Sequence, residues 1–167
     1  MTSRFRMADE TKCILLVEDN EDDAALALRA LRTNRITNDV VHARDGADAR
    51  DYLFALGDHT GRDVCDLPQL ILLDLKLPKL DGLDVLRRIR ADARTRFIPV
   101  VVLTSSDEED DVVQAYGQGA NSFIRKPVDF DAFMDTIRQT SVYWLLVNAP
   151  PPSAPPAAAA WAAAGGA

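Results

Sequence analysis

Several short apolar runs in this chain end in side chains that can do chemistry. These side chains are Glu18, Asp19, Asp74, Thr104 and Lys126. Carboxylates held within a few ångströms of one another repel, so such a group either takes up protons or holds a cation. Because Mg²⁺ prefers oxygen ligands and typically uses one or two carboxylates together with water, the three acids predict a Mg²⁺ site if the fold gathers them.

The elements that would gather them follow from the spacing of apolar residues. From Cys13 onward, short apolar runs alternate with longer amphipathic segments, which is typical of helices that cross over between buried parallel strands. Strands are expected at 13–17, 39–43, 70–74, 99–104 and 121–124. Helices are expected near 22–34, 46–56, 82–92, 108–118 and 129–147. The predicted fold class is therefore α/β, a (βα)5 doubly wound parallel sheet, whose functional crevice lies beyond the carboxyl ends of its strands.

A simpler interpretation exists for each residue alone. Asp74 by itself could be a turn or cap residue, since aspartate often ends strands. Here four strand ends carry, in turn, a pair of acids, an aspartate, a hydroxyl and a Lys-Pro step. Such a combination rarely occurs by chance. The constellation therefore favours a functional site.

Composition excludes several classes of protein. The formal net charge of −7 leaves no basic surplus for phosphates or anionic lipid, so nucleic-acid binding is not expected. No apolar run approaches the roughly 20 residues of a membrane span, and the start of the chain lacks the apolar core of a signal peptide, so we expect a cytoplasmic protein without membrane contact. Cys13 and Cys65 are expected to be free thiols, and His42 and His59 lack partners for catalysis or metal binding.

One domain with two tails is the expected organisation. Residues 1–11 form an N-terminal extension, 12–148 the domain, and 149–167 a Pro/Ala-rich tail that we expect to be disordered. A polar insertion at 57–68 is predicted to be a surface loop. No patterned segment for a DNA-binding or enzymatic module follows the domain, so the domain is expected to act through a protein contact.

Four motifs carry a resemblance to a known family. They are "VEDN", "LLDLKLPKLDG", "VVLTSS" and "FIRKP". With them, residues 12–147 resemble the response regulator receiver domain of two-component signalling, which implies a flavodoxin-like fold with strand order 2-1-3-4-5. The "VVHARDG" segment, the insertion and the apolar end of the last helix are similar to stand-alone receivers that partner bacteriophytochrome-type sensor histidine kinases.

The resemblance implies a role for each acid. Asp74 is expected to be the phosphoacceptor, a carboxylate nucleophile that attacks the phosphorus of a phosphohistidine on the kinase. Asp19, Asp74 and the backbone carbonyl of Lys76 are expected to ligate Mg²⁺, with Glu18 acting through water. The metal would offset the repulsion between the nucleophile and an anionic phosphoryl group.

The same resemblance implies a switch. Lys126 and the Thr104 hydroxyl would contact phosphoryl oxygens, and the Lys126–Pro127 peptide is expected to be cis. Thr104 would move toward the phosphoryl group, and the ring of Phe123 would enter the space it leaves. The alternative for Phe123 is an ordinary core position.

The signal is expected to leave through the surface of the fourth helix, the fifth strand and the fifth helix. The end of that last helix is apolar on almost every side, which a monomer cannot bury completely. The residues expected at an interface are Tyr143, Trp144, Leu145 and Leu146. A homodimer is therefore predicted.

Two rival functions can be weighed. A haloacid-dehalogenase-like phosphatase needs a second aspartate two residues after its nucleophile to protonate the leaving group, and Lys76 stands there. A degenerate receiver that binds partners without phosphorylation would lack part of the constellation, and none of it is missing. We therefore expect a phosphoacceptor that is no enzyme beyond slow loss of its own phosphate.

Overall fold

The computed structural model describes residues 12–151. The N-terminal extension and the part of the predicted tail from residue 152 onward lie outside these residues. The strands are β1 (Ile14–Val17), β2 (Val40–Ala43), β3 (Leu70–Leu73), β4 (Val100–Thr104) and β5 (Ser122–Arg125). The helices are α1 (Glu21–Thr33), α2 (Gly46–Phe54), α3 (Gly82–Ala91), α4 (Glu109–Gly117) and α5 (Phe130–Val142).

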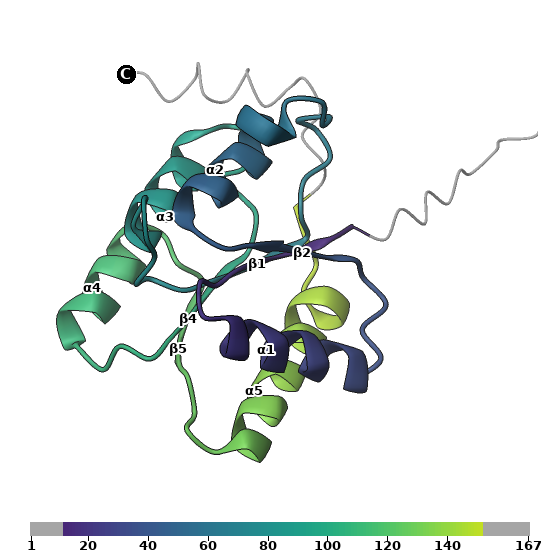
Figure 1. Cartoon of the computed structure of the whole chain (residues 1–167), viewed down its shortest axis with the longest axis vertical. Helices are drawn as coiled ribbons and strands as arrows, with labels where there is room; N and C mark the ends of the chain where they lie inside the picture. Colours follow the sequence, from purple (N-terminus) through teal and green to yellow (C-terminus); the bar gives the residue numbers. More distant parts are fainter. Residues whose placement is uncertain (1–11, 152–167) are drawn as a thin grey trace, which may run out of the picture.

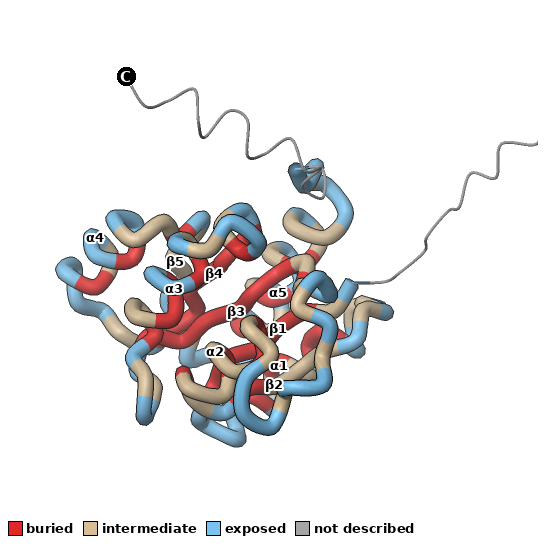
Figure 2. Tube along the Cα trace, turned by 90° about the horizontal axis from the view of Figure 1, so that it is seen from above, coloured by how far each residue is buried: buried red, intermediate tan, exposed pale blue. Residues whose placement is uncertain are grey.

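The five strands form one parallel sheet in the order β2-β1-β3-β4-β5, which confirms the predicted fold and strand order. Every residue of β1, β3 and β4 is buried, because helices cover both faces of the sheet, whereas the edge strands β2 and β5 are only partly buried. Figure 2 shows these central strands as the buried interior.

Two hydrophobic cores lie on opposite faces of the sheet. Helices α1 and α5 pack on one face, where Leu31 and Ile137 are buried, and α2, α3 and α4 pack on the other, around Leu53 and Leu86 (Figure 1). This alternation of faces is the doubly wound arrangement that the sequence predicts. It leaves the carboxyl edge of the sheet free of covering helices.

Acidic and amide caps start the helices at that edge. The side chains of Asn20, Asp45, Asp81 and Asp129 each accept a hydrogen bond from a backbone N–H in the first turn of α1, α2, α3 and α5. These caps fix where the helices begin after the strand ends.

The insertion at 57–68 is a surface loop, but it is tied to α2. It contains a short 3₁₀ helix, Gly57–His59. The guanidinium of Arg62 lies 3.6 Å from the centroid of the Tyr52 ring and donates to the Tyr52 carbonyl, and His59 Nε2 lies 2.8 Å from Asp48 Oδ1. These polar contacts, which hydrophobic periodicity does not reveal, hold the insertion in place.

The last helix changes form where its sequence becomes apolar. After Val142 it continues as a π-helical segment, η2 (Tyr143–Val147). The side chains of Trp144 and Leu145 pack against the core beside α1 and α5, whereas Tyr143 and Leu146 are exposed by 49% and 75%. Only part of the predicted interface is therefore open to a partner. No helix among residues 12–151 is long and apolar enough to cross a membrane.

Candidate functional site

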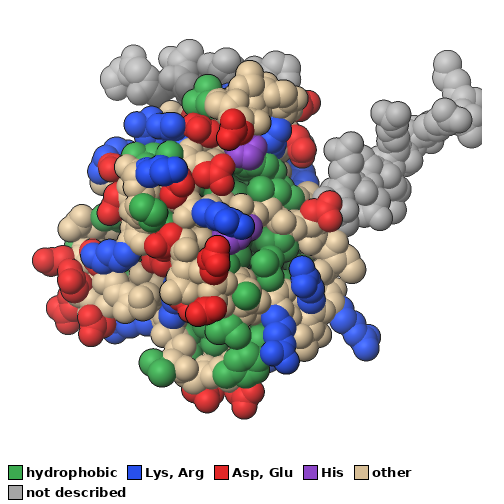
Figure 3. Space-filling model, in the orientation of Figure 1, with side chains coloured by type: hydrophobic (Ala, Val, Ile, Leu, Met, Phe, Trp, Pro, Cys, Tyr) green, Lys and Arg blue, Asp and Glu red, His purple; other side chains and the backbone are tan. Residues whose placement is uncertain are grey.

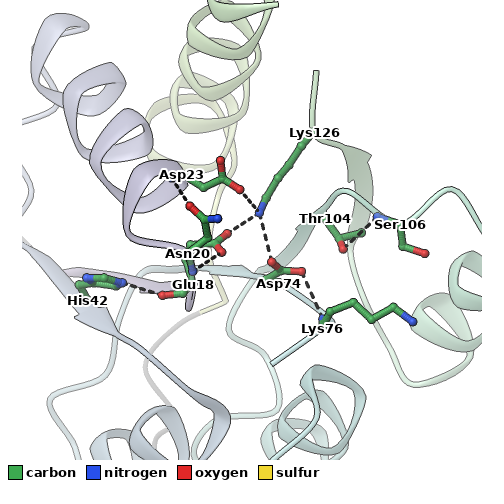
Figure 4. A network of polar contacts seen from close by, with 9 residues as sticks. All are labelled: Glu18, Asn20, Asp23, His42, Asp74, Lys76, Thr104, Ser106 and Lys126. Atoms are coloured by element: carbon green, nitrogen blue, oxygen red, sulfur yellow. Dashed lines mark hydrogen bonds and ion pairs between the residues drawn. The ribbon is translucent and has the colours of Figure 1, made fainter. Parts of the chain in front are cut away.

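The five candidate residues come from four strand ends that meet at the carboxyl edge of the sheet. Glu18 and Asp19 follow β1, Asp74 follows β3, Thr104 ends β4, and Lys126 follows β5. Because all the strands are parallel, these ends share one edge, and Figure 4 shows the side chains of Glu18, Asp74 and Lys126 pointing toward one another. The structure thus brings together what the sequence places far apart.

The three acids are arranged as ligands for a cation. One carboxylate oxygen from each of Glu18, Asp19 and Asp74 lies within 4.8 Å of the other two. Glu18 and Asp74 are only 4% and 6% exposed, whereas Asp19 is exposed and its side chain makes no hydrogen bond or ion pair within residues 12–151. Hard oxygen donors with one carboxylate left free fit a Mg²⁺-like ion.

Lys126 is the cation of the cluster. Its Nζ lies 2.5 Å from Glu18 Oε2 and 3.1 Å from Asp74 Oδ2. Burial opposes the charge of Lys126, but its hydrogen bond to Glu18 and the charge of Asp74 outweigh that effect and raise the lysine pKa. The lysine therefore stays an ammonium.

The same surroundings also shift the pKa of Glu18. Burial and the nearby charge of Asp74 raise its pKa to about 7, although the hydrogen bond from Lys126 acts in the opposite direction. The Glu18 carbonyl lies 2.8 Å from His42 Nε2, so this histidine, for which the sequence suggests no role, supports the backbone of the site.

A second polar network surrounds the hydroxyl of Thr104, which is fully buried. Its Oγ1 accepts a hydrogen bond of 3.3 Å from the backbone N–H of Ser106, and the Ser106 hydroxyl donates to Asp111 in the first turn of α4. Lys76 Nζ also lies 3.3 Å from Asp111 Oδ2. The hydrogen bonds from Ser106 and Lys76 lower the pKa of Asp111, so this network links the loops after β3 and β4.

Lys76 contacts the proposed nucleophile through its backbone. Its N–H donates to Asp74 Oδ1 at 3.3 Å, and Figure 4 shows its side chain extending away from Asp74. The ion pair with Asp111 directs that side chain to α4. The predicted role of the Lys76 carbonyl as a metal ligand stays a prediction.

The expected cis peptide before Pro127 is not present. No peptide bond among residues 12–151 is cis. The backbone N–H of Lys126 donates to the Thr104 carbonyl at 2.8 Å, which extends the β4–β5 pairing by one residue. From that position the four-carbon lysine side chain reaches the carboxylates with a trans peptide, so the cis geometry is not needed for this contact.

Two further positions escaped the sequence interpretation. Asp23, in the first turn of α1, lies 3.0 Å from Lys126 Nζ through its Oδ2. Gly82 starts α3 so close to β3 that a Cβ there would lie 2.3 Å from the Asp74 carbonyl oxygen. A signal for Asp23 was available, because it lies only four residues after Asp19 at the start of a helix, but an acid in a first turn is equally explained by the helix dipole.

The remaining predicted residues lie outside the acid cluster. Phe123, on β5, is partly buried and packs against the core beneath α2, α3 and α4. The η2 segment lies at the opposite, amino edge of the sheet, because the Leu145 carbonyl accepts a 3.3 Å hydrogen bond from Gln69 just before β3. A contact through η2 would therefore leave the cluster open.

Comparison with known proteins agrees with this geometry. The family model of the response regulator receiver domain matches residues 14–138. The response regulator Rcp1 of Synechocystis sp. is 37% identical over 142 residues, covering 83% of this chain and 95% of Rcp1. A structure of the Mn²⁺-bound form of Rcp1 superposes with a TM-score of 0.77 at 36% identity, covering 84% of this chain and 99% of Rcp1.

Two other solved structures are similar. The phosphorylated cyanobacterial phytochrome response regulator RcpA is 38% identical, with a TM-score of 0.78 over 84% of this chain and 98% of RcpA. The bacteriophytochrome response regulator RtBRR is 46% identical, with a TM-score of 0.68 over 92% of each chain. Sequence, fold and an acidic cluster at the carboxyl edge of the sheet agree, and the chain belongs to the response regulator receiver domain family.

Proposed function

We propose that this chain accepts a phosphoryl group from a sensor histidine kinase onto Asp74. The observation that carries the proposal is the setting of the Asp74 carboxylate. It is almost fully buried, and it is held between the Lys126 ammonium at 3.1 Å and the Lys76 N–H at 3.3 Å. A fixed carboxylate beside a fixed cation can attack an anionic phosphoryl group that the cation helps to position.

Each step of the transfer has a residue to perform it. A carboxylate oxygen of Asp74 forms a bond to phosphorus as the bond from phosphorus to the kinase imidazole breaks, and the imidazole leaves. Lys126 donates to a phosphoryl oxygen as a point charge. The hydroxyl of Thr104, whose oxygen already accepts from Ser106, directs its own proton to another phosphoryl oxygen.

Mg²⁺ is the proposed cofactor. Glu18, Asp19, Asp74 and the Lys76 carbonyl would hold it, and the convergence of the three carboxylates and the unpaired state of Asp19 among the described residues support this. When bound, the metal would supply positive charge that reduces the repulsion between Asp74 and a phosphoryl group. The Mn²⁺-bound form of Rcp1 is a related protein with a divalent cation.

The proposed output is a change of the α4-β5-α5 surface. Thr104 would move toward the phosphoryl group, and Phe123, which is only partly buried on β5, would turn inward. The α4 end of this surface is acidic, since Glu109, Asp110 and Asp111 form its first turn, and Figure 3 shows acidic side chains gathered there. Such a surface suits a partner with basic side chains.

The kinase is proposed to be of the bacteriophytochrome type. The support is the similarity to RcpA, a phytochrome response regulator, and to RtBRR, a bacteriophytochrome response regulator. Phosphotransfer from a panel of purified kinases would show which kinase transfers fastest.

A small phosphodonor tests the function directly. Incubation of the chain with acetyl phosphate and Mg²⁺ is expected to add one phosphoryl group, seen by intact-mass spectrometry and lost again over time by hydrolysis of the acyl phosphate. A chain that stays unchanged in mass, and that also gains no phosphate from any kinase, would instead be a phosphorylation-independent binding module. The phosphatase alternative gains no support, because Lys76 at the required position pairs with Asp111.

A homodimer is proposed through the α4-β5-α5 surface together with η2. The exposed side chains of Tyr143 and Leu146 supply apolar area for it, and Tyr143 packs edge-on against Trp144 with ring centroids 4.9 Å apart. Replacing Tyr143 and Leu146 by alanine is expected to weaken association about tenfold or more, because central aromatic contacts dominate interfaces. Sedimentation velocity over a concentration series measures it.

The control for the dimer is Leu56→Ala, which truncates a comparably exposed apolar side chain beside α2. This variant is expected to sediment like the wild type. If the double variant also keeps the wild-type mass distribution, η2 is not part of a dimer interface.

A further inference from the structure

The ammonium of Lys126 has all its donors in use. An ammonium carries three N–H donors and no acceptor. Glu18 Oε2 takes one at 2.5 Å, Asp74 Oδ2 one at 3.1 Å, and Asp23 Oδ2 one at 3.0 Å (Figure 4). Two of these acceptors belong to the acid cluster at the strand ends. The third comes from a helix and has no part in the function proposed above.

Asp23 approaches the ammonium differently from the other two acids. Its backbone N–H donates to the side chain of the cap residue Asn20 at 3.0 Å, so the first turn of α1 holds its backbone in place. Its side chain is 36% exposed, against 5% for Glu18 and 8% for Asp74. Asp23 is therefore the most accessible of the three acceptors and the easiest for an incoming anion to displace.

We propose that Asp23 is a positioning residue that holds Lys126 in the resting chain and competes with the phosphoryl group for the lysine. The inference rests on the proposed function of Asp74. In the resting chain the Asp23 carboxylate occupies a donor that a phosphoryl oxygen can use, and its negative charge repels that oxygen. The same charge attracts the cation that the neighbouring carboxylates would hold. Asp23 thus favours metal binding and disfavours the phosphoryl group.

The opposite effects on cation and anion binding distinguish an electrostatic role of Asp23 from a purely structural one. A residue that only supports the fold of the site would, when replaced, weaken the binding of cation and anion together. Removal of a competing charge must instead weaken cation binding and strengthen anion binding. Measuring both affinities of one variant therefore distinguishes these two roles of Asp23.

The variant is Asp23→Asn, which keeps the shape and one acceptor oxygen but removes the charge. Calorimetric titration of the full chain with Mg²⁺ alone, and with beryllium fluoride in saturating Mg²⁺, gives the two affinities. We expect Mg²⁺ to bind about three- to tenfold more weakly and beryllium fluoride about three- to tenfold more tightly, as the loss of one partly screened charge predicts. A change of both affinities in the same direction, or of neither, would overturn the proposal.

The matched control is Asp22→Asn. Asp22 is exposed in the same helical turn and carries the same charge, but its side chain makes no contact with Lys126. Both affinities are expected to stay within about twofold of the wild type, because the charge of an exposed side chain that does not contact the site is largely screened. Equal effects of the two variants would overturn the role of Asp23 alone. A wild-type chain that binds Mg²⁺ but no beryllium fluoride would overturn the proposed function, and this inference with it.

Discussion

Replacement of Asp74 by asparagine is expected to abolish phosphoryl acceptance and leave the fold intact. An amide oxygen is not a nucleophile of the required kind, so no acyl phosphate can form. The amide has nearly the same shape as the carboxylate and still offers an acceptor to Lys126, so the packing around it is retained. Intact-mass spectrometry after incubation with acetyl phosphate and Mg²⁺ is the measurement, and the phosphorylated fraction should fall below detection.

Asp107→Asn is the control for that experiment. Asp107 is an exposed acid on the loop that follows β4, three residues beyond Thr104, and is not one of the three clustered acids. It is expected to accept phosphate at the wild-type level. If Asp74→Asn still gains a phosphoryl group that hydroxylamine releases, another carboxylate is the acceptor and the assignment of Asp74 is wrong.

Replacement of Lys126 by methionine is expected to destabilise the metal-free chain in a pH-dependent manner. Methionine fills similar space but leaves Glu18 and Asp74 buried without their cation. Loss of one partner from a buried charge cluster costs about 3 kcal/mol or more. We expect a loss of that size in the free energy of unfolding near pH 8 in EDTA, measured by urea denaturation.

The sign of the pH effect follows from Glu18. Burial raises its pKa from the ordinary 4.5 to about 7, so the folded chain binds this proton more tightly than the unfolded chain. Stability therefore falls as the pH rises between those two values. Without Lys126, whose hydrogen bond lowers the pKa of Glu18, the fall extends to higher pH. The deficit of the variant should thus shrink toward about pH 5, where Glu18 takes up a proton, and Mg²⁺ should restore part of it.

Lys79→Met provides the comparison for the Lys126 variant. Lys79 Nζ pairs with Asp45 Oδ2 at 3.0 Å, but its side chain is 69% exposed. A pair whose lysine is in solvent contributes about 1 kcal/mol. The pKa of Asp45 lies below its ordinary value, so no change is expected between about pH 5 and pH 8. A Lys126 variant with the same small and pH-independent loss would show that the acid cluster does not depend on the lysine.

Local features of the chain were sufficient to predict the fold and which strand ends carry the clustered acids and the lysine. The apolar runs "ILLV" and "LILL" have no polar alternation, so they fit only strands buried on both faces, and each expected element appears within a few residues of its predicted bounds. Because parallel strands share a carboxyl edge, residues that end them must meet there. That rule alone brings Asp74 to Glu18 and Lys126.

Other features of the site depend on contacts between elements and could not be predicted from the sequence. The peptide before Pro127 is trans, and Asp23 contacts Lys126. Both features depend on where α1 and the end of β5 lie relative to each other, which a local sequence pattern does not show. The close approach of Gly82 to the end of β3 likewise depends on how two elements pack together.

The last helix, away from the site, also has one feature that the sequence predicts and another that only the tertiary structure determines. Its sequence predicts an apolar end, but only the packing of α1 and α5 determines that Trp144 turns inward while Leu146 stays exposed. Periodicity determines which residues end a strand or share a helix face, because it acts over a few neighbouring residues. Which donor meets which acceptor is set by atoms brought together from distant parts of the chain, and so by the tertiary structure.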